Sequence, residues 1–100
     1  MTLTRLTVGL LGLLILSAGS YADGDQENAR RLVNEGIILP LERIAESARR
    51  LHPGRILEVE LEKKQGRYLY EIEIITDRGE VWEMKFDAVT GEILKHERED

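Results

Sequence analysis

The spacing of apolar residues changes along the chain from a helical period to a strand period. Between residues 29 and 37, apolar positions recur at i, i+3, i+4 and i+8, which predicts an amphipathic helix. A second helix is predicted from about Leu41 to Leu51, because Pro40 suits the first turn of a helix and Pro53-Gly54 would stop it. From Arg55 onward apolar and charged residues alternate, and this period of two predicts half-buried antiparallel strands.

The turns between the strands predict how the strands pair. Gln65-Gly66 is a two-residue hairpin loop, which places Lys64 opposite Arg67. Apolar residues of the first two strands then face each other: Leu61 and Tyr70, Val59 and Ile72, Leu57 and Ile74. The next loop needs three residues, Asp77-Arg78-Gly79 with a left-handed Gly79, because a slip of one residue would turn every side chain to the other face.

One face of this sheet is apolar, and the Leu41–Leu51 helix would cover it. In the last turn, Asp87 would accept backbone amides and Gly91 would take a positive φ, and a short fourth strand from Glu92 to His96 would follow. The predicted fold is α+β, with one or two helices packed on an antiparallel meander of three to four strands. The apolar face is expected to comprise Leu57, Val59, Leu61, Tyr68, Tyr70, Ile72, Ile74, Trp82, Met84 and Phe86.

The first 22 residues have the layout of a cleavable secretory signal peptide. Arg5 supplies a positive charge, residues 6–16 form an uncharged apolar run, and Ser20-Tyr21-Ala22 is a small-x-small cleavage site. The run is short for a membrane span, which needs about 20 residues, although an uncleaved anchor is the alternative. We expect a periplasmic or secreted protein without a membrane span after cleavage, with a leader and helix over residues 23–37 and one domain over residues 38–100.

Charge and composition exclude several classes of function. Once Arg5 is removed with the signal peptide, 13 Lys and Arg residues remain against 19 Asp and Glu residues, a net charge of −6. An acidic domain lacks the basic footprint that nucleic acid requires. The chain has no cysteine, so disulfides and thiolate metal sites are excluded and a single core must stabilise the domain.

The second half of the chain resembles the PepSY domain. The resemblance is carried by Tyr70-Glu71-Ile72-Glu73-Ile74, by Asp77-Arg78-Gly79, and by the run from Trp82 to Leu94 that contains Asp87-Ala88-Val89-Thr90-Gly91-Glu92. Leu39–Ile44 and Leu57–Leu61 look like the helix and first strand of exported, stand-alone bacterial members, so the resemblance covers roughly residues 38–96. It implies a helix on an antiparallel sheet outside the cytoplasm, and a peptidase-inhibiting or regulatory role has been proposed for the family.

Residues that could support catalysis are few and scattered. His52 and His96 are far apart in the sequence without a metal-binding spacing, and His52 is expected simply to end the second helix. Ser47, Thr76 and Thr90 lie in no nucleophile motif. We therefore expect a protein that is not an enzyme and that uses no cofactor, with Trp82 as a core residue.

The polar face of the predicted sheet is strongly acidic. Glu58, Glu73 and Glu83 would form one row across three strands, and Glu60, Glu71 and Lys85 the next. Like charges that face each other are destabilising. The three-glutamate row is therefore either a cation site or a surface for a basic partner, or else a solvated face whose repulsion nearby lysines and arginines relieve.

An apolar row lies beside these glutamates in the same register. Ile56 would pair with Ile75, and Ile75 with Val81. Either the helix over residues 29–37 folds across this row, or it stays with the second helix and leaves the row exposed as a binding surface. We favour the exposed row, because the link from Gly36 to Pro40 is short.

These observations predict a non-catalytic binding or regulatory module that contacts another protein of the cell envelope. The alternatives are a metal- or small-ligand-binding sensor accessory that uses the acidic face, and a peptidase inhibitor. The expected partner is an envelope protein or a peptidase, and a second copy of the chain is a further alternative.

Overall fold

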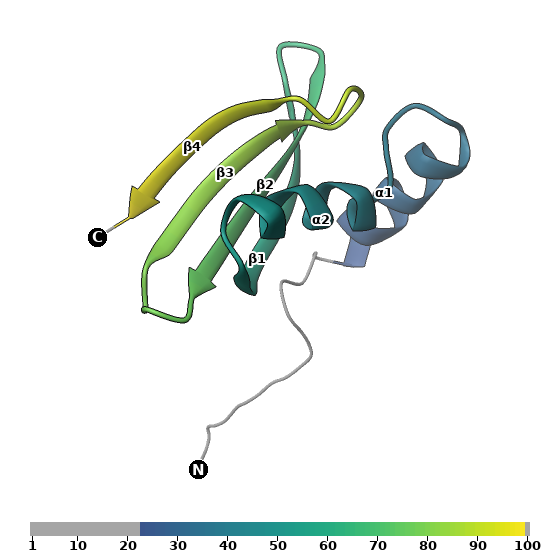
Figure 1. Cartoon of the computed structure of the whole chain (residues 1–100). Helices are drawn as coiled ribbons and strands as arrows, with labels where there is room; N and C mark the ends of the chain where they lie inside the picture. Colours follow the sequence, from purple (N-terminus) through teal and green to yellow (C-terminus); the bar gives the residue numbers. More distant parts are fainter. Residues whose placement is uncertain (1–22, 100) are drawn as a thin grey trace.

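The computed structural model describes residues 23–99, which form two helices followed by four strands (Figure 1). The antiparallel sheet has the order β1-β2-β3-β4, so the α+β meander expected from the sequence is confirmed. The predicted signal peptide lies outside the described residues. The elements are α1 (Asp23–Asn34), α2 (Leu41–Leu51), β1 (Gly54–Lys64), β2 (Arg67–Thr76), β3 (Val81–Asp87) and β4 (Ile93–Glu99).

The two predicted hairpin loops are confirmed. Lys64 pairs with Arg67 across Gln65-Gly66, whose φ angles of 50° and 80° are those of a primed hairpin turn. The second loop places Ile74 opposite Trp82. Turn chemistry and alternation therefore predicted the register across most of the sheet.

The predicted pairing of Leu57 with Ile74 is wrong, because β1 contains a bulge. Ile74 pairs with Ile56, and the register shifts between Ile56 and Glu58. A bulge places two residues of one strand opposite one residue of its partner, so the alternation of side chains is interrupted there. Ile56 consequently points into the core with 6% of its surface exposed, whereas Leu57 is 39% exposed.

The core lies between the apolar face of the sheet and the two helices, which lie on the same side of the sheet (Figure 1). α2 contributes Ile44, Ala45 and Ala48, and α1 contributes Leu32. The prediction that residues 29–37 stay on the side of α2 is thus confirmed, and α1 does not cover the opposite face. The centre of the core is made of fully buried side chains: Tyr70, Ile72, Ile74, Met84 and Phe86.

The linker between the helices is tied to the sheet. The Leu39 N–H donates to the carbonyl of Ala88 at 2.8 Å. The Tyr70 hydroxyl donates to the Leu39 carbonyl at 2.9 Å. These bonds fix where α2 begins and therefore how it crosses the sheet.

β4 begins one residue later and ends three residues later than the sequence predicted. It pairs with β3 along its length, with a second bulge that is opposite Lys85 and Phe86. Within residues 23–99 no helix is long and apolar enough to cross a membrane.

Candidate functional site

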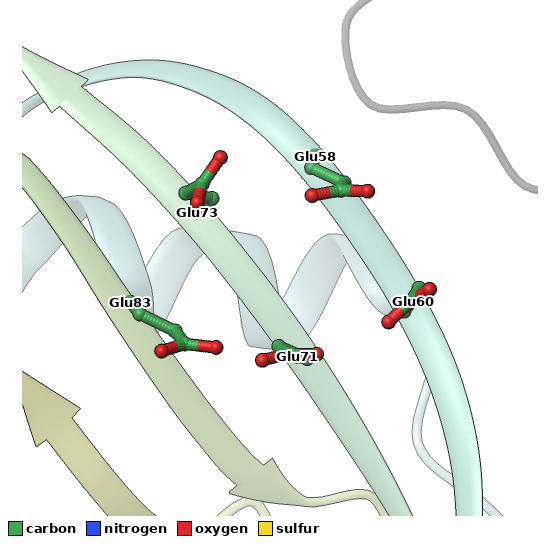
Figure 2. A pocket seen from close by; sticks show the side chains of 5 residues that line it. All are labelled: Glu58, Glu60, Glu71, Glu73 and Glu83. Carbon is green, nitrogen blue, oxygen red and sulfur yellow. The ribbon is translucent and has the colours of Figure 1, made fainter. Parts of the chain in front are cut away.

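The face of the sheet opposite the helices carries a shallow hollow lined by carboxylates (Figure 2). The hollow encloses about 50 Å³ and lies over β1, β2 and β3. α2 passes behind the strands in this view, so the carboxylates lie on the uncovered side. The lining residues are Glu58, Glu60, Glu71, Glu73 and Glu83.

The register confirms both predicted cross-strand rows. Glu73 lies between Glu58 and Glu83, and Glu71 lies between Glu60 and Lys85. The structure therefore brings the three glutamates proposed as a cation face together, but it adds Glu60 and Glu71 to the same hollow. The bulge at residues 56–58 does not disturb these rows, because it precedes Glu58 along β1.

Hydrogen bonds among these carboxylates, together with burial, change their protonation. A hydrogen bond to Glu83, together with burial and a hydrogen bond to Glu60, raises the pKa of Glu71 to about 8. The same hydrogen bond lowers the pKa of Glu83, so the proton belongs to Glu71 and Glu83 accepts it. Burial and a hydrogen bond to Glu99 raise the pKa of Glu73. At neutral pH the hollow therefore holds a proton that isolated carboxyls would have lost.

Lysines at the margin of the hollow relieve part of the repulsion. Lys95 Nζ lies 3.3 Å from Glu83 Oε1, and the pair raises the pKa of Lys95. Lys85 Nζ lies 3.7 Å from Glu62 Oε1. The sequence predicted relief by Lys85, whereas the contribution of Lys95 depends on β4, whose register was not predicted.

A set of carboxylates close enough to share a cation differs from the predicted row. Glu60, Glu62 and Glu71 each offer an oxygen atom, and these atoms lie within 4.8 Å of one another. Hard cations such as Ca²⁺ take oxygen ligands of this kind, although they use 6–8 of them. The candidate cation position in the structure therefore lies one cross-strand row away from the predicted row of Glu58, Glu73 and Glu83.

The apolar row predicted beside the glutamates is only partly formed. Ile75 pairs with Val81, and both are half-buried on the face opposite the helices. The prediction that Ile56 belongs to this row is wrong, because the bulge in β1 turns Ile56 into the core and places Arg55 opposite Ile75. Of the predicted apolar row, Ile75 and Val81 therefore remain beside the acidic hollow.

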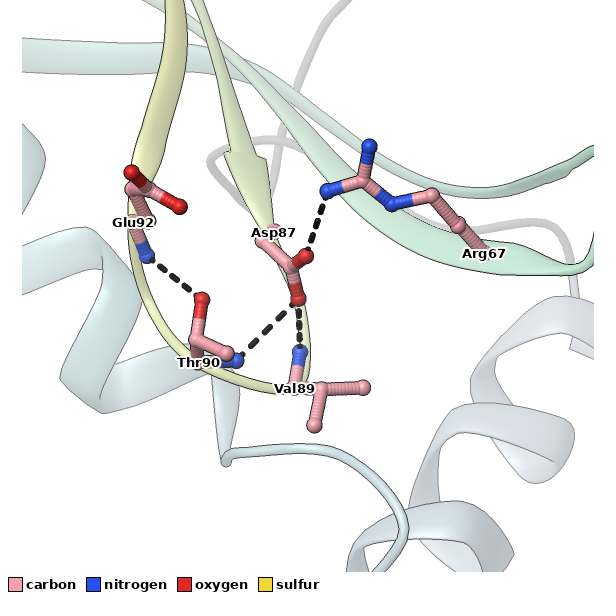
Figure 3. Close-up of polar contacts among 5 residues, drawn as sticks. All are labelled: Arg67, Asp87, Val89, Thr90 and Glu92. Carbon is pink, nitrogen blue, oxygen red and sulfur yellow. Dashed lines mark hydrogen bonds and ion pairs between the residues drawn. The ribbon is translucent and has the colours of Figure 1, made fainter.

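Asp87 organises the turn between β3 and β4, as the sequence predicted (Figure 3). Its Oδ1 accepts hydrogen bonds from the backbone amides of Val89 at 2.8 Å and Thr90 at 3.1 Å. Its Oδ2 accepts a hydrogen bond from Arg67 Nη2 at 2.7 Å. Arg67 is the main cause of a lowered pKa for the Asp87 carboxyl. Gly91, with φ 83°, completes the turn, so these residues have a structural role.

A cluster of aromatic rings that the sequence did not predict lies on the helix-covered face of the sheet, where α2 ends. His52 stacks on Trp82 with ring centroids 3.9 Å apart, and the rings of His52 and His96 have centroids 4.6 Å apart. The Nε2 atoms of the two histidines contact each other. Trp82 packs against the core as expected, and His52 does end α2. Because the two histidines are 44 residues apart, only the fold reveals that they meet.

Comparison with known proteins identifies the family. The PepSY model, described as peptidase propeptide and YPEB domain, matches residues 38–97. The chain belongs to the PepSY family. PepSY domains are generally non-catalytic propeptide or inhibitor modules, and they typically occur in exported proteins. No curated protein and no solved structure matches the chain.

Proposed function

We propose that this PepSY protein is a regulatory module of the cell envelope that binds a partner protein through the uncovered face of its sheet. The observation that carries the proposal is the row of Glu58, Glu73 and Glu83 on a face that neither α1 nor α2 covers. Such a row destabilises the isolated domain. A partner that places lysines or arginines over it would remove that cost on binding.

The charge state of the hollow supports a basic partner. A cationic side chain near Glu71 would displace the proton that the carboxyl retains in the free protein, because a neighbouring positive charge favours the ionised form. Ile75 and Val81 lie beside the glutamates and supply an apolar contact. Non-obligate interfaces are, as a whole, only about as apolar as the rest of the protein surface, so a largely polar face with a small apolar contact can serve as one.

A charge-reversal experiment tests this proposal. The mature chain, residues 23–100, is immobilised and exposed to an envelope extract of its own cells, and the captured proteins are quantified by mass spectrometry. The wild type is compared with Glu73→Lys, and Glu46→Lys is the matched control because it makes the same charge change on α2, on the other side of the sheet.

The proposal predicts a protein that is captured by the wild type and by Glu46→Lys, lost with Glu73→Lys, and released as the ionic strength rises. Capture that is equal for all three forms would contradict a binding role for the acidic face. Capture by Ile75→Asp measures how much the apolar residues beside the glutamates contribute to binding, provided that the circular dichroism of this variant matches that of the wild type.

Cation binding is a second candidate function, favoured by the convergence of Glu60, Glu62 and Glu71. If these carboxylates bind calcium, millimolar Ca²⁺ raises the melting temperature of the wild type and not of Glu71→Gln. An unchanged melting temperature of the wild type would contradict this candidate.

Direct inhibition of a peptidase is a third candidate, favoured by the description of the family as a peptidase propeptide domain. Addition of the purified mature chain to the peptidases secreted by the same cells tests it. Inhibition that is abolished by Glu73→Lys and retained by Glu46→Lys would identify the peptidase as the partner of the acidic face.

A further inference from the structure

The two histidines of the chain come from opposite ends of the domain's sequence and meet in one cluster. His52 follows the last residue of α2, and His96 lies in β4 opposite Met84. Their Nε2 atoms contact each other, so the same nitrogen of each ring faces the space between the two residues. We propose that His52 and His96 together bind a divalent transition-metal ion, such as Zn(II) or Cu(II), through these Nε2 atoms.

The required geometry is close to the one that the structure holds. Zinc–nitrogen bonds of about 2.0–2.1 Å at a tetrahedral angle separate two ligand nitrogens by roughly 3.4 Å. The two Nε2 atoms must move apart to admit an ion between them, and this movement falls to the exposed ring of His96 because His52 is stacked on Trp82. The chain has no cysteine and therefore no thiolate ligand. Imidazole nitrogen favours Cu(II), Zn(II) and Ni(II) over Mg²⁺ and Ca²⁺, which prefer oxygen ligands.

The ring of His52 is held in place by its neighbours. Trp82 stacks on it with an angle of 13° between the ring planes. The backbone N–H of His52 donates to the carbonyl of Ala48 at 3.0 Å, which fixes the end of α2. Gly54, two residues later, lies so close to β2 that a side chain on it would meet the carbonyl oxygen of Ile75. Ligands held by rigid elements in this way lose little freedom when they bind a metal.

The charged side chains around the cluster partly neutralise one another. Glu80 is the nearby carboxylate; it accepts a hydrogen bond from Trp82 Nε1 at 3.2 Å and pairs with Arg78 and Arg98. These arginines are thereby partly neutralised and do not face the ion as uncompensated charges.

The cluster is open enough to exchange a metal with solvent. His96 is exposed and His52 is half-buried. Two imidazoles fill two of the four positions of a tetrahedral ion, which leaves the others to water or to a donor from a second molecule. This site lies on the helix-covered face and is separate from the carboxylates of the proposed partner surface.

The test uses the mature chain without a polyhistidine tag. Zn(II) is titrated while the imidazole nitrogens are followed by two-dimensional nitrogen–proton NMR, and the melting temperature is measured in parallel. Since the chain has two histidines, each imidazole signal reports on the cluster directly. We expect saturation at one equivalent, a shift of both Nε2 signals, and an increase in melting temperature of several degrees that Mg²⁺ does not reproduce.

The variants separate this site from the carboxylates. His96→Gln replaces an exposed side chain and is expected to abolish both the NMR shift of His52 and the increase in melting temperature. Glu71→Gln, on the opposite face of the sheet, keeps both imidazoles and is expected to retain both responses. Absence of an Nε2 shift in the wild type at excess Zn(II) and Cu(II) would overturn the proposal. A thermal response that persists unchanged in His96→Gln would overturn it as well, because the ion would then be bound elsewhere.

Discussion

The hydroxyl of Tyr70 donates a hydrogen bond to the main-chain carbonyl of Leu39, with 2.9 Å between the two oxygen atoms. Tyr70 is fully buried in the centre of the sheet, and Leu39 lies in the linker just before α2. One side chain therefore connects the central strand to the segment that positions the helix.

Replacement Tyr70→Phe removes this bond while it keeps the ring. We expect the free energy of unfolding to fall by about 0.5–1.5 kcal/mol, because the Leu39 carbonyl loses a partner in a partly buried position. Urea denaturation measures the change. Tyr68→Phe, on the same face of β2 but half-buried, is the control and should change stability less; equal effects would contradict a specific role for the Tyr70 hydroxyl.

Asp87→Ala removes the acceptor that organises the β3–β4 turn. At neutral pH we expect a loss of about 1.5–3 kcal/mol, the range for hydrogen bonds to charged groups. Because folding lowers the pKa of this carboxyl, its contribution is complete above its ordinary pKa and is lost as the pH falls through the lower folded-state pKa. Denaturation curves recorded at successively lower pH should therefore show that the variant and the wild type approach the same free energy of unfolding. Glu92→Ala replaces an exposed side chain of the same turn and is the control; we expect it to change stability at neutral pH much less than Asp87→Ala does.

Glu71 is expected to lower the stability of the wild type as the pH rises, and Glu71→Gln should remove this dependence. The folded protein keeps a proton on Glu71 up to about pH 8, whereas the unfolded chain releases it near 4.5. Stability of the wild type therefore falls as the pH rises across this interval. The variant should match the wild type at the acidic end and exceed it at the alkaline end. Parallel stability profiles for the two proteins would show that Glu71 titrates normally.

Gly54→Ala tests the close approach of β1 to β2 beside the histidine cluster. A methyl group there would lie 2.2 Å from the carbonyl oxygen of Ile75. We expect a loss of about 1–3 kcal/mol, typical of overpacking. Gly66→Asn is the control, because its turn conformation suits asparagine and the space around it is open. A tolerated Gly54→Ala would mean that the two strands can separate at this point.

The hairpins could be predicted from the sequence because local chemistry determines them. Gln65-Gly66 and Asp77-Arg78-Gly79 specify loops of defined length, and alternation then assigns each side chain to a face. The row of Glu58, Glu73 and Glu83 follows from these two facts alone. Turn chemistry also predicted the role of Asp87, which accepts backbone amides in the β3–β4 turn.

The errors arose where a strand departs from strict alternation or where distant residues meet. The bulge at Leu57 has no glycine or proline to mark it, and so Ile56 was assigned to the wrong face. The contact between His52 and His96 depends jointly on where α2 ends and on how β4 pairs with β3. The end of α2 at Leu51 was predicted correctly, but the register of β4 was not, and so the contact could not be inferred from the sequence.

The uninterrupted order β1-β2-β3-β4 also has a consequence for how the chain reaches this structure. Every strand finds its neighbour across a loop of a few residues, so closing each hairpin costs little chain entropy. Proteins dominated by such local pairings fold faster than those whose strands must pair across long connections. We therefore expect the sheet to assemble hairpin by hairpin, with the acidic row forming during folding and not after it.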